Sequence, residues 1–182
     1  IQKIEQKDIY FVDKYALSYK HLNGEEQIAL NKRLIAYAKE ETEKSYLIDL
    51  YNGVYVLSDA LGEKQSDNKL YLDSAFLYVN EASNKLSIGK LYYTIGNYYW
   101  DQKEEELSHQ FYRKSLAVCD GERGGELVML NALYRIAISY LWRQDAVSLK
   151  QCIDEMLDLA HKEKGPEAYI TSFPVVSAYY RT

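Results

Sequence analysis

The chain has 182 residues and a formal net charge of −5, with 47% hydrophobic and 27% charged residues. This balance supports a buried core and argues against a wholly disordered chain, and the acidic excess with dispersed lysines and arginines argues against nucleic-acid binding. The 19 tyrosines are the unusual feature of the composition, because their amphipathic rings suit surfaces that are half buried and half wet.

Apolar residues recur at helical spacing along nearly the whole chain, and strand-like alternation over six or more residues is missing from the sequence. Turn-forming residues at 23–24, 62–68, 120–125 and 165–166 separate the helical patterns. Asp67 and Asp145 are the predicted N-caps of the helices that follow them. The expected helices span residues 4–21, 25–42, 44–61, 67–83, 87–101, 104–119, 126–143, 146–162 and 167–180.

The strongest pattern is an internal repeat with a displacement of 41 residues. On the first helices, one apolar face runs through Ile88, Tyr92, Ile95, Gly96 and Tyr99, and then through Met129, Leu133, Ile136, Ala137 and Tyr140. The second helices keep the same displacement, from Ser108, Tyr112 and Ser115 to Leu149, Ile153 and Met156. An earlier pair follows more loosely, through Leu50, Gly53, Val54 and Leu57 and then Leu72, Ala75, Phe76 and Val79.

The repeating unit is therefore a helix pair, and short connections predict antiparallel hairpins. We expect an all-α single domain over residues 1–182. Its hairpins span approximately 4–42, 44–83, 87–119 and 126–162, and a terminal helix spans 167–180.

Residues 89–122 resemble a tetratricopeptide repeat, since Tyr92, Ile95, Gly96, Tyr99, Ser108, Tyr112 and Ser115 occupy that family's positions at its spacing. A glycine inside a helix costs about 1 kcal/mol relative to alanine. The resemblance implies that Gly96 permits close approach of the partner helix, with the small Ser108 opposite; a merely tolerated glycine is the alternative. In the next unit Ala137 replaces the glycine. The resemblance also implies a right-handed α-α superhelix of about four hairpins.

The first helices of such a stack line a concave surface, on which the resemblance places a candidate peptide-binding face. By repeat position this face includes Tyr51, Tyr55, Lys90, Tyr93, Asn97, Trp100, Asn131, Tyr134, Arg135 and Ile138. Tyr51, Tyr93 and Tyr134 are expected to share one position in three units and to form an aromatic stripe; the alternative is that they only close the packing between helices. The family's carboxylate clamp is not favoured, because Tyr93 and Asn131 replace its lysines.

No catalytic motif is present in the sequence, and we expect neither a metal nor a cofactor. Cys119 and Cys152 follow the apolar pattern and are predicted to be core thiols, with a mutual disulfide as the alternative. His109 is expected to be exposed beside Glu104–Glu106, which open their helix as a solvated face. The glycine-rich run 120–125 is predicted to be a turn between repeats, because it has neither a Lys-Ser/Thr ending nor a preceding strand for phosphate binding.

The sequence therefore predicts a non-catalytic scaffold that binds a protein or peptide segment. A weaker resemblance, in its tyrosine-rich character, is to helical-repeat input regions of bacterial sensor histidine kinases and related regulators. It implies a soluble segment of a larger signalling protein, either cytoplasmic or periplasmic, and the start at Ile1 fits a segment or a mature form. The alternatives are a homo-oligomerisation module and small-ligand binding between hairpins. No apolar run approaches the roughly 20 residues that span a bilayer, so membrane contact is not expected.

Overall fold

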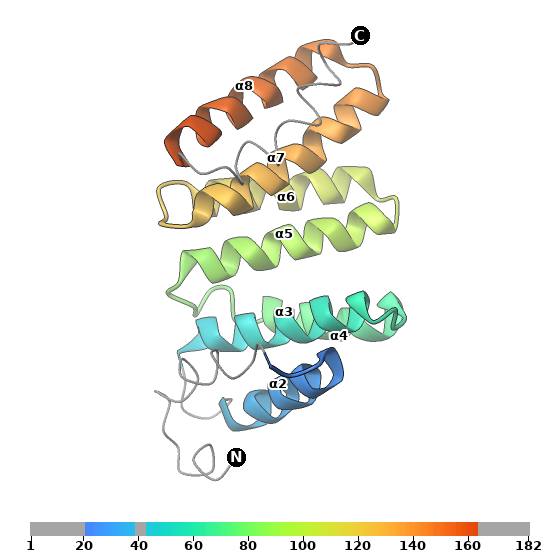
Figure 1. Cartoon of the computed structure of the whole chain (residues 1–182), viewed down its shortest axis with the longest axis vertical. Coiled ribbons are helices and arrows are strands. Elements are labelled where there is room, and N and C mark those ends of the chain that lie inside the picture. Colours follow the sequence, from blue (N-terminus) through green and yellow to red (C-terminus); the bar gives the residue numbers. More distant parts are fainter. Residues whose placement is uncertain (1–20, 39–42, 164–182) are drawn as a thin grey trace. The chain divides into compact units, whose positions relative to one another are not determined.

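The computed structural model describes residues 21–38 and 43–163, and within them the fold is all-α (Figure 1). The described part contains seven helices and no strand, which confirms the predicted fold class. Residues 4–20, 39–42 and 167–180, where further helical turns are predicted, lie outside it. None of the seven helices is both long and apolar enough to cross a membrane.

The chain divides into two compact units, Ile1–Ser83 and Asn84–Thr182, and each is described by itself. The arrangement of all hairpins in one continuous superhelix therefore stays a prediction. We call the two parts the N-terminal unit and the C-terminal unit.

The N-terminal unit is built around α3 (Lys44–Ala60), which contacts both α2 (Gly24–Ala38) and α4 (Gln65–Phe76). Leu47, Ile48 and Val54 of α3 are fully buried. The start of α2 is fixed by a capping box, in which Asn23 Oδ1 accepts from the backbone N–H of Glu26 (3.0 Å) and Glu26 Oε2 accepts from that of Asn23 (2.8 Å).

Helix α4 differs from the prediction at both ends. It begins at Gln65, so Asp67 lies in its first turn and is not the N-cap. It ends at Phe76 rather than at residue 83, because the N–H groups of Tyr78 and Val79 bond to carbonyls three residues earlier. The chain then reaches Ser83, whose backbone N–H and hydroxyl both donate to the Glu43 carboxylate at 2.9 and 3.1 Å. This contact ties the two ends of the α3–α4 hairpin together.

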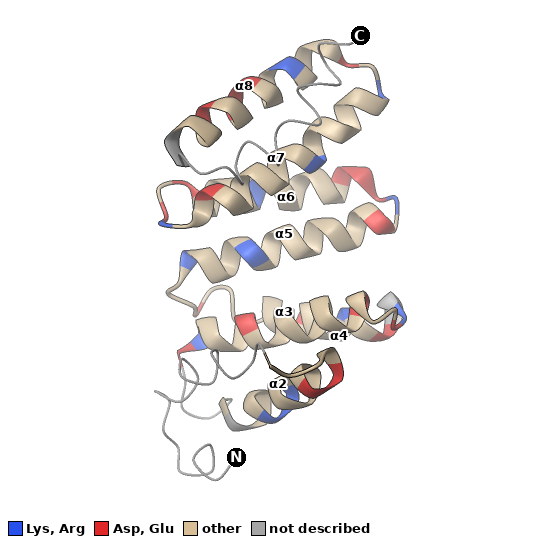
Figure 2. Ribbon diagram, viewed as in Figure 1, with Lys and Arg blue, Asp and Glu red and all other residues tan. Residues whose placement is uncertain are grey.

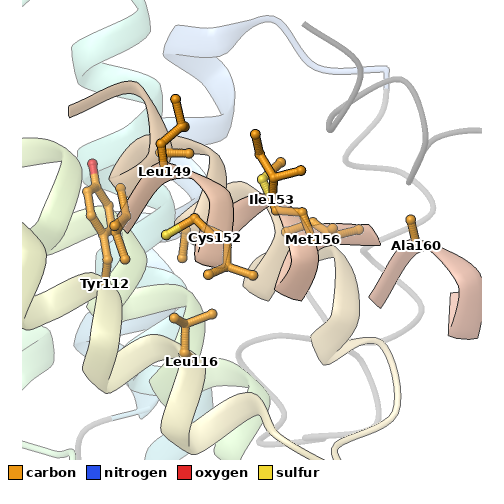
Figure 3. Packing of buried hydrophobic residues seen from close by; sticks show 12 residues of the cluster. Tyr112, Leu116, Leu149, Cys152, Ile153, Met156 and Ala160 are labelled. Carbon is orange, nitrogen blue, oxygen red and sulfur yellow. The ribbon is translucent and has the colours of Figure 1, made fainter. Parts of the chain in front are cut away.

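The C-terminal unit contains α5 (Lys85–Asp101), α6 (Glu105–Cys119), α7 (Gly125–Trp142) and α8 (Ala146–Glu163). Each helix contacts the next along the chain, and α5 also contacts α7. Figure 3 shows side chains of α6 and α8 meeting in one buried cluster that includes Tyr112, Leu116, Cys152, Ile153 and Met156. Cys119 and Cys152 are both buried free thiols, which confirms the core prediction, and burial raises the pKa of Cys152 to about 11.

The 41-residue period reappears as a repeated helix ending. Residues Gly62, Lys103 and Gln144 follow α3, α5 and α7, and all three have left-handed backbone with φ of 77°, 62° and 57°. In each turn the N–H of this residue bonds to the carbonyl three residues earlier, and the next N–H bonds to the carbonyl five residues earlier. These are the two bonds of a Schellman motif. The helices α3, α5 and α7 therefore end at equivalent positions of the 41-residue repeat.

Two of these turns carry a side chain where glycine is preferred, which gives a first testable prediction. Left-handed backbone costs a non-glycine residue about 1 kcal/mol or more. We expect Lys103→Gly and Gln144→Gly each to raise the free energy of unfolding by about 1 kcal/mol, measured by denaturant titration. Gln102→Gly is the control, because Gln102 has φ −76° and gains nothing from glycine. Equal destabilisation by Lys103→Gly and Gln102→Gly would contradict the assigned turn.

Candidate functional site

The helix-packing residues predicted for the C-terminal unit lie at its helix interfaces. Gly96, Ser108, Tyr112 and Ala137 are buried. The half-buried rings also contact neighbours: Tyr92 and Tyr99 lie 6.1 and 5.6 Å from Phe111, and Tyr140 lies 5.6 Å from His109, between ring centroids. Close approach at Gly96 is confirmed, but the nearest atoms belong to Tyr112 rather than to the predicted Ser108. A Cβ at position 96 would lie 2.5 Å from two carbons of the Tyr112 ring.

The residues predicted for the C-terminal half of the candidate binding face are half-buried or exposed. On α5, Tyr93, Asn97 and Trp100 are half-buried and Lys90 is exposed. On α7, which contacts α5, four residues are half-buried: Asn131, Tyr134, Arg135 and Ile138. Tyr93 and Tyr134 are 41 residues apart, as predicted, and both pack on the edge of the core cluster. Asn97 has a packing role, since its Oδ1 accepts from the Tyr112 hydroxyl at 2.8 Å.

The N-terminal half of the predicted face is wrong. Tyr51 and Tyr55 are only 6% and 3% exposed and lie in the core of the N-terminal unit. The reason is register: α3, α5 and α7 end at Ala60, Asp101 and Trp142, which are 41 residues apart. Tyr51 therefore corresponds to Tyr92 and Leu133, whereas Asn52 corresponds to Tyr93. Of the predicted stripe, Tyr93 and Tyr134 occupy equivalent positions and Tyr51 does not.

A cavity of about 560 Å³ lies where α5 and α7 end, and this site was missed in the sequence. We call it the tryptophan cavity: it is lined by Trp100, Asp101, Lys103, Glu105, Ser139, Trp142 and Arg143. The rings of Trp100 and Trp142 lie 5.3 Å apart between centroids and are inclined by 33°. Trp142 is 72% exposed. The sequence signal that could have indicated the cavity is that both tryptophans of the chain lie near the ends of predicted first helices.

One wall of the tryptophan cavity is a charged cluster. Glu105 Oε2 lies 2.7 Å from Arg143 Nη2, and Glu105 Oε1 accepts from the Ser139 hydroxyl. Burial alone would raise the pKa of Glu105, but these hydrogen bonds and the charge of Arg143 outweigh it and hold the pKa below its usual value. In Figure 2 the red ribbon segments mark acidic residues at the end of α5 and at the start of α6.

The predicted exposure of His109 is wrong. Its side chain is 16% exposed, because Tyr140 of α7 packs edge-on against its ring. Burial lowers the pKa of His109, although the Glu105 carboxylate 4.0 Å away acts in the opposite direction. Burial therefore favours the neutral form of His109, whose ring packs against Tyr140.

The Glu105 contacts give a pH-dependent prediction. A carboxyl whose pKa is lowered by folding stabilises the fold above its unfolded pKa, about 4.3, and this contribution disappears as pH falls through the folded pKa. Since the pair is partly exposed, we expect Glu105→Gln to lower the free energy of unfolding at pH 7 by about 0.5–1 kcal/mol, or roughly 2 °C in Tm. In thermal melts the difference from the wild type should shrink as the pH falls below the unfolded pKa and through the lower folded pKa. Glu104→Gln, at an exposed position, is the control; a Glu105→Gln deficit independent of pH would contradict the charge assignment.

The remaining predicted features have structural roles. Residues 120–124 of the run 120–125 form the turn before α7, with Gly121 and Gly124 at φ 75° and 79°, and Gly125 is the first residue of the helix. Asp145 is confirmed as an N-cap, because its Oδ1 accepts from the Ser148 N–H at 3.1 Å. Among the described residues, no group of three or more His, Cys, Asp or Glu side chains is placed to bind a metal.

No protein-family model, curated protein or solved structure matches the chain. The resemblance to tetratricopeptide repeats therefore stays a prediction, supported by the residues at which this chain carries the motif.

Proposed function

We propose that the chain is a tetratricopeptide-like scaffold, without catalytic activity of its own, that binds a peptide or protein segment on the adjacent α5 and α7 helices. The observation that carries the proposal is the pair Tyr93 and Tyr134, half-buried at equivalent positions of two first helices that contact each other. Rings of this kind give large contact area with little loss of conformational entropy, which is typical of binding surfaces.

The surrounding residues support binding rather than catalysis as the role of this face. Lys90 is exposed and Arg135 half-buried, and both offer donors to the backbone carbonyls of an extended peptide. The groups with marked pKa changes, such as Tyr112 and Cys152, owe them mainly to burial in the core. A role as the input region of a larger bacterial signalling protein belongs to the same proposal and rests on the sequence resemblance.

The experiment is selection of a displayed random-peptide library on the immobilised chain, followed by affinity measurement on two matched double variants. Tyr93→Ala/Tyr134→Ala removes the candidate contact rings. Tyr99→Ala/Tyr140→Ala removes two tyrosines at equivalent positions of the same helices, whose rings contact Phe111 and His109. Both double variants remove packing contacts, since the Tyr93 ring lies 5.8 Å from that of Tyr112. Circular dichroism sets a temperature at which both variants remain folded.

We expect the Tyr93/Tyr134 variant to lose at least tenfold in affinity and the Tyr99/Tyr140 variant to keep its affinity while losing thermal stability. Equal losses in folded samples would contradict the proposal and assign Tyr93 and Tyr134 to packing alone. Light scattering on the same samples tests the alternative of an oligomerisation module, which requires the molar mass to increase with concentration.

A further inference from the structure

The tryptophan cavity has the composition of a binding site. Its volume of about 560 Å³ falls in the range of small-molecule and side-chain pockets. Both tryptophans of the chain line it, from the ends of two different helices. Most of the Trp142 side chain is exposed to solvent. Tryptophan is among the residue types enriched at the interface positions that contribute most of the binding energy.

Comparison between repeats shows that the fold does not require an apolar residue at position 142. The turns after α5 and α7 have the same backbone hydrogen bonds, displaced by 41 residues. Position 142 therefore corresponds to position 101, where the chain carries an exposed aspartate. By the same displacement of 41 residues, Val147, which is also 72% exposed, corresponds to the exposed Glu106. Trp142 lines the cavity and Val147 does not.

The charges of the cavity wall indicate what it accepts. The cavity wall contains two carboxylates, Asp101 and Glu105, and two cations, Lys103 and Arg143, so its net charge is zero. Glu105 and Arg143 are paired with each other at 2.7 Å. Because the two signs balance, the wall gives a charged ligand no net attraction, whereas an uncharged ring can pack on the two indoles in the tilted or stacked geometry that aromatic groups prefer.

We infer that the tryptophan cavity binds one uncharged aromatic side chain, a phenylalanine or tyrosine, of the peptide held by α5 and α7. The inference rests on the proposed function, and it adds a specificity-determining anchor to it. Lys103, whose ammonium pairs with no carboxylate in the described part of the chain, is placed at the cavity wall to donate to a backbone carbonyl next to the anchor.

The test uses the tryptophans themselves as reporters. Since Trp100 and Trp142 are the two tryptophans of the chain, selective excitation of indole reports on this cavity. The probe is N-acetyl-phenylalaninamide, and the matched probes are the leucine, glutamate and lysine analogues. We expect a saturable change in emission with the phenylalanine probe, at least fivefold weaker binding of the leucine probe, and no saturable change with the charged probes.

Two variants separate the cavity from general surface stickiness. Trp142→Asp places at position 142 the residue that the preceding repeat carries at position 101, so we expect an unchanged thermal melt and at least tenfold weaker binding in ligand-observed NMR. Val147→Glu, its matched control, copies Glu106 in the same way and should bind like the wild type. Equal loss in both variants, or equal affinity for all four probes, would overturn the inference.

Two further outcomes distinguish the alternatives. Emission that changes with protein concentration in the absence of any probe, and is abolished by Trp142→Asp, would overturn the inference in favour of contact between two copies of the chain. Selected peptides that bind Trp142→Asp as tightly as the wild type would overturn the anchor while leaving the α5–α7 face intact. Failure of the proposed function gives a different result, because no peptide would then be selected at all.

Discussion

Gly96→Leu is expected to lower the free energy of unfolding by about 3 kcal/mol or more, because it forces a side chain into a tight contact between α5 and α6. Even the first added carbon would lie 2.5 Å from two ring carbons of Tyr112. That ring is fully buried, and its hydroxyl is bound to Asn97 one residue from the substituted position. The ring therefore cannot move aside without losing the hydrogen bond and disturbing the core.

Gly96→Ala separates the contact from helix propensity. In an exposed helix this change would stabilise by about 1 kcal/mol. Here we expect a net loss of roughly 1–2 kcal/mol, since the overpacking cost exceeds the propensity gain. Denaturant titration of the two single variants measures both effects, and stabilisation by alanine would contradict the observed proximity of Tyr112.

The repeat provides a compensating substitution. The positions that correspond to Gly96 and Tyr112 hold Ala137 and Ile153, a larger residue facing a smaller one. We expect the double variant Gly96→Ala/Tyr112→Ile to be more stable than the sum of its single variants predicts, with a coupling of about 1 kcal/mol. Strict additivity would mean that the two side chains do not constrain each other.

The elements of the C-terminal unit could be predicted to within about two residues, because their apolar periodicity is strong and sustained. The packing role of Gly96 was also predictable, since a glycine in mid-helix needs a reason. Its contact with Tyr112 was not, because which residue of the facing helix lies opposite depends on the crossing of the two helices.

The register of the first unit could not be read from the apolar pattern alone. The apolar pattern of a helix still matches when two repeats are aligned with an error of one residue. Such an error aligned Tyr51 with Tyr93, whereas it corresponds to Tyr92. The feature that fixes the register is the left-handed turn residue, and only Gly62 among the three is a glycine. Lys103 and Gln144 give no sequence indication of that conformation.

The burial of His109 and Glu105 illustrates a second limit. Both lie on the first turns of α6 and have a polar local sequence, which favours a solvated face. Their contacts come from Ser139 and Tyr140 of α7 and from its C-cap Arg143, more than 30 residues later. Local sequence contains no information on such contacts, so the charged wall of the tryptophan cavity emerges only from the packing of α7 on α6.

Gly125→Ala is expected to be another strongly destabilising substitution, and its cause is backbone rather than side-chain crowding. A Cβ at position 125 would lie 2.5 Å from the carbonyl oxygen of Cys119 and 3.1 Å from its Cβ. That oxygen accepts the Glu122 N–H at 3.0 Å, so it is fixed within the turn. Relief requires the end of α6 to move away from the start of α7, at an expected cost of roughly 2–3 kcal/mol.

Gly121→Ala is the control, because Gly121 lies in the same turn but has a strained backbone conformation and no crowding. Its φ of 75° strains any side chain, but no atom lies within 4 Å of the added carbon. We expect it to cost about 1 kcal/mol from strain alone, less than Gly125→Ala in denaturant titrations of both variants. The difference measures how closely α6 and α7 approach at Cys119. Equal losses of unfolding free energy in Gly125→Ala and Gly121→Ala would show that the turn opens freely. The alignment of α5 with α7, which the binding face requires, would then have to depend on the direct contact between these two helices.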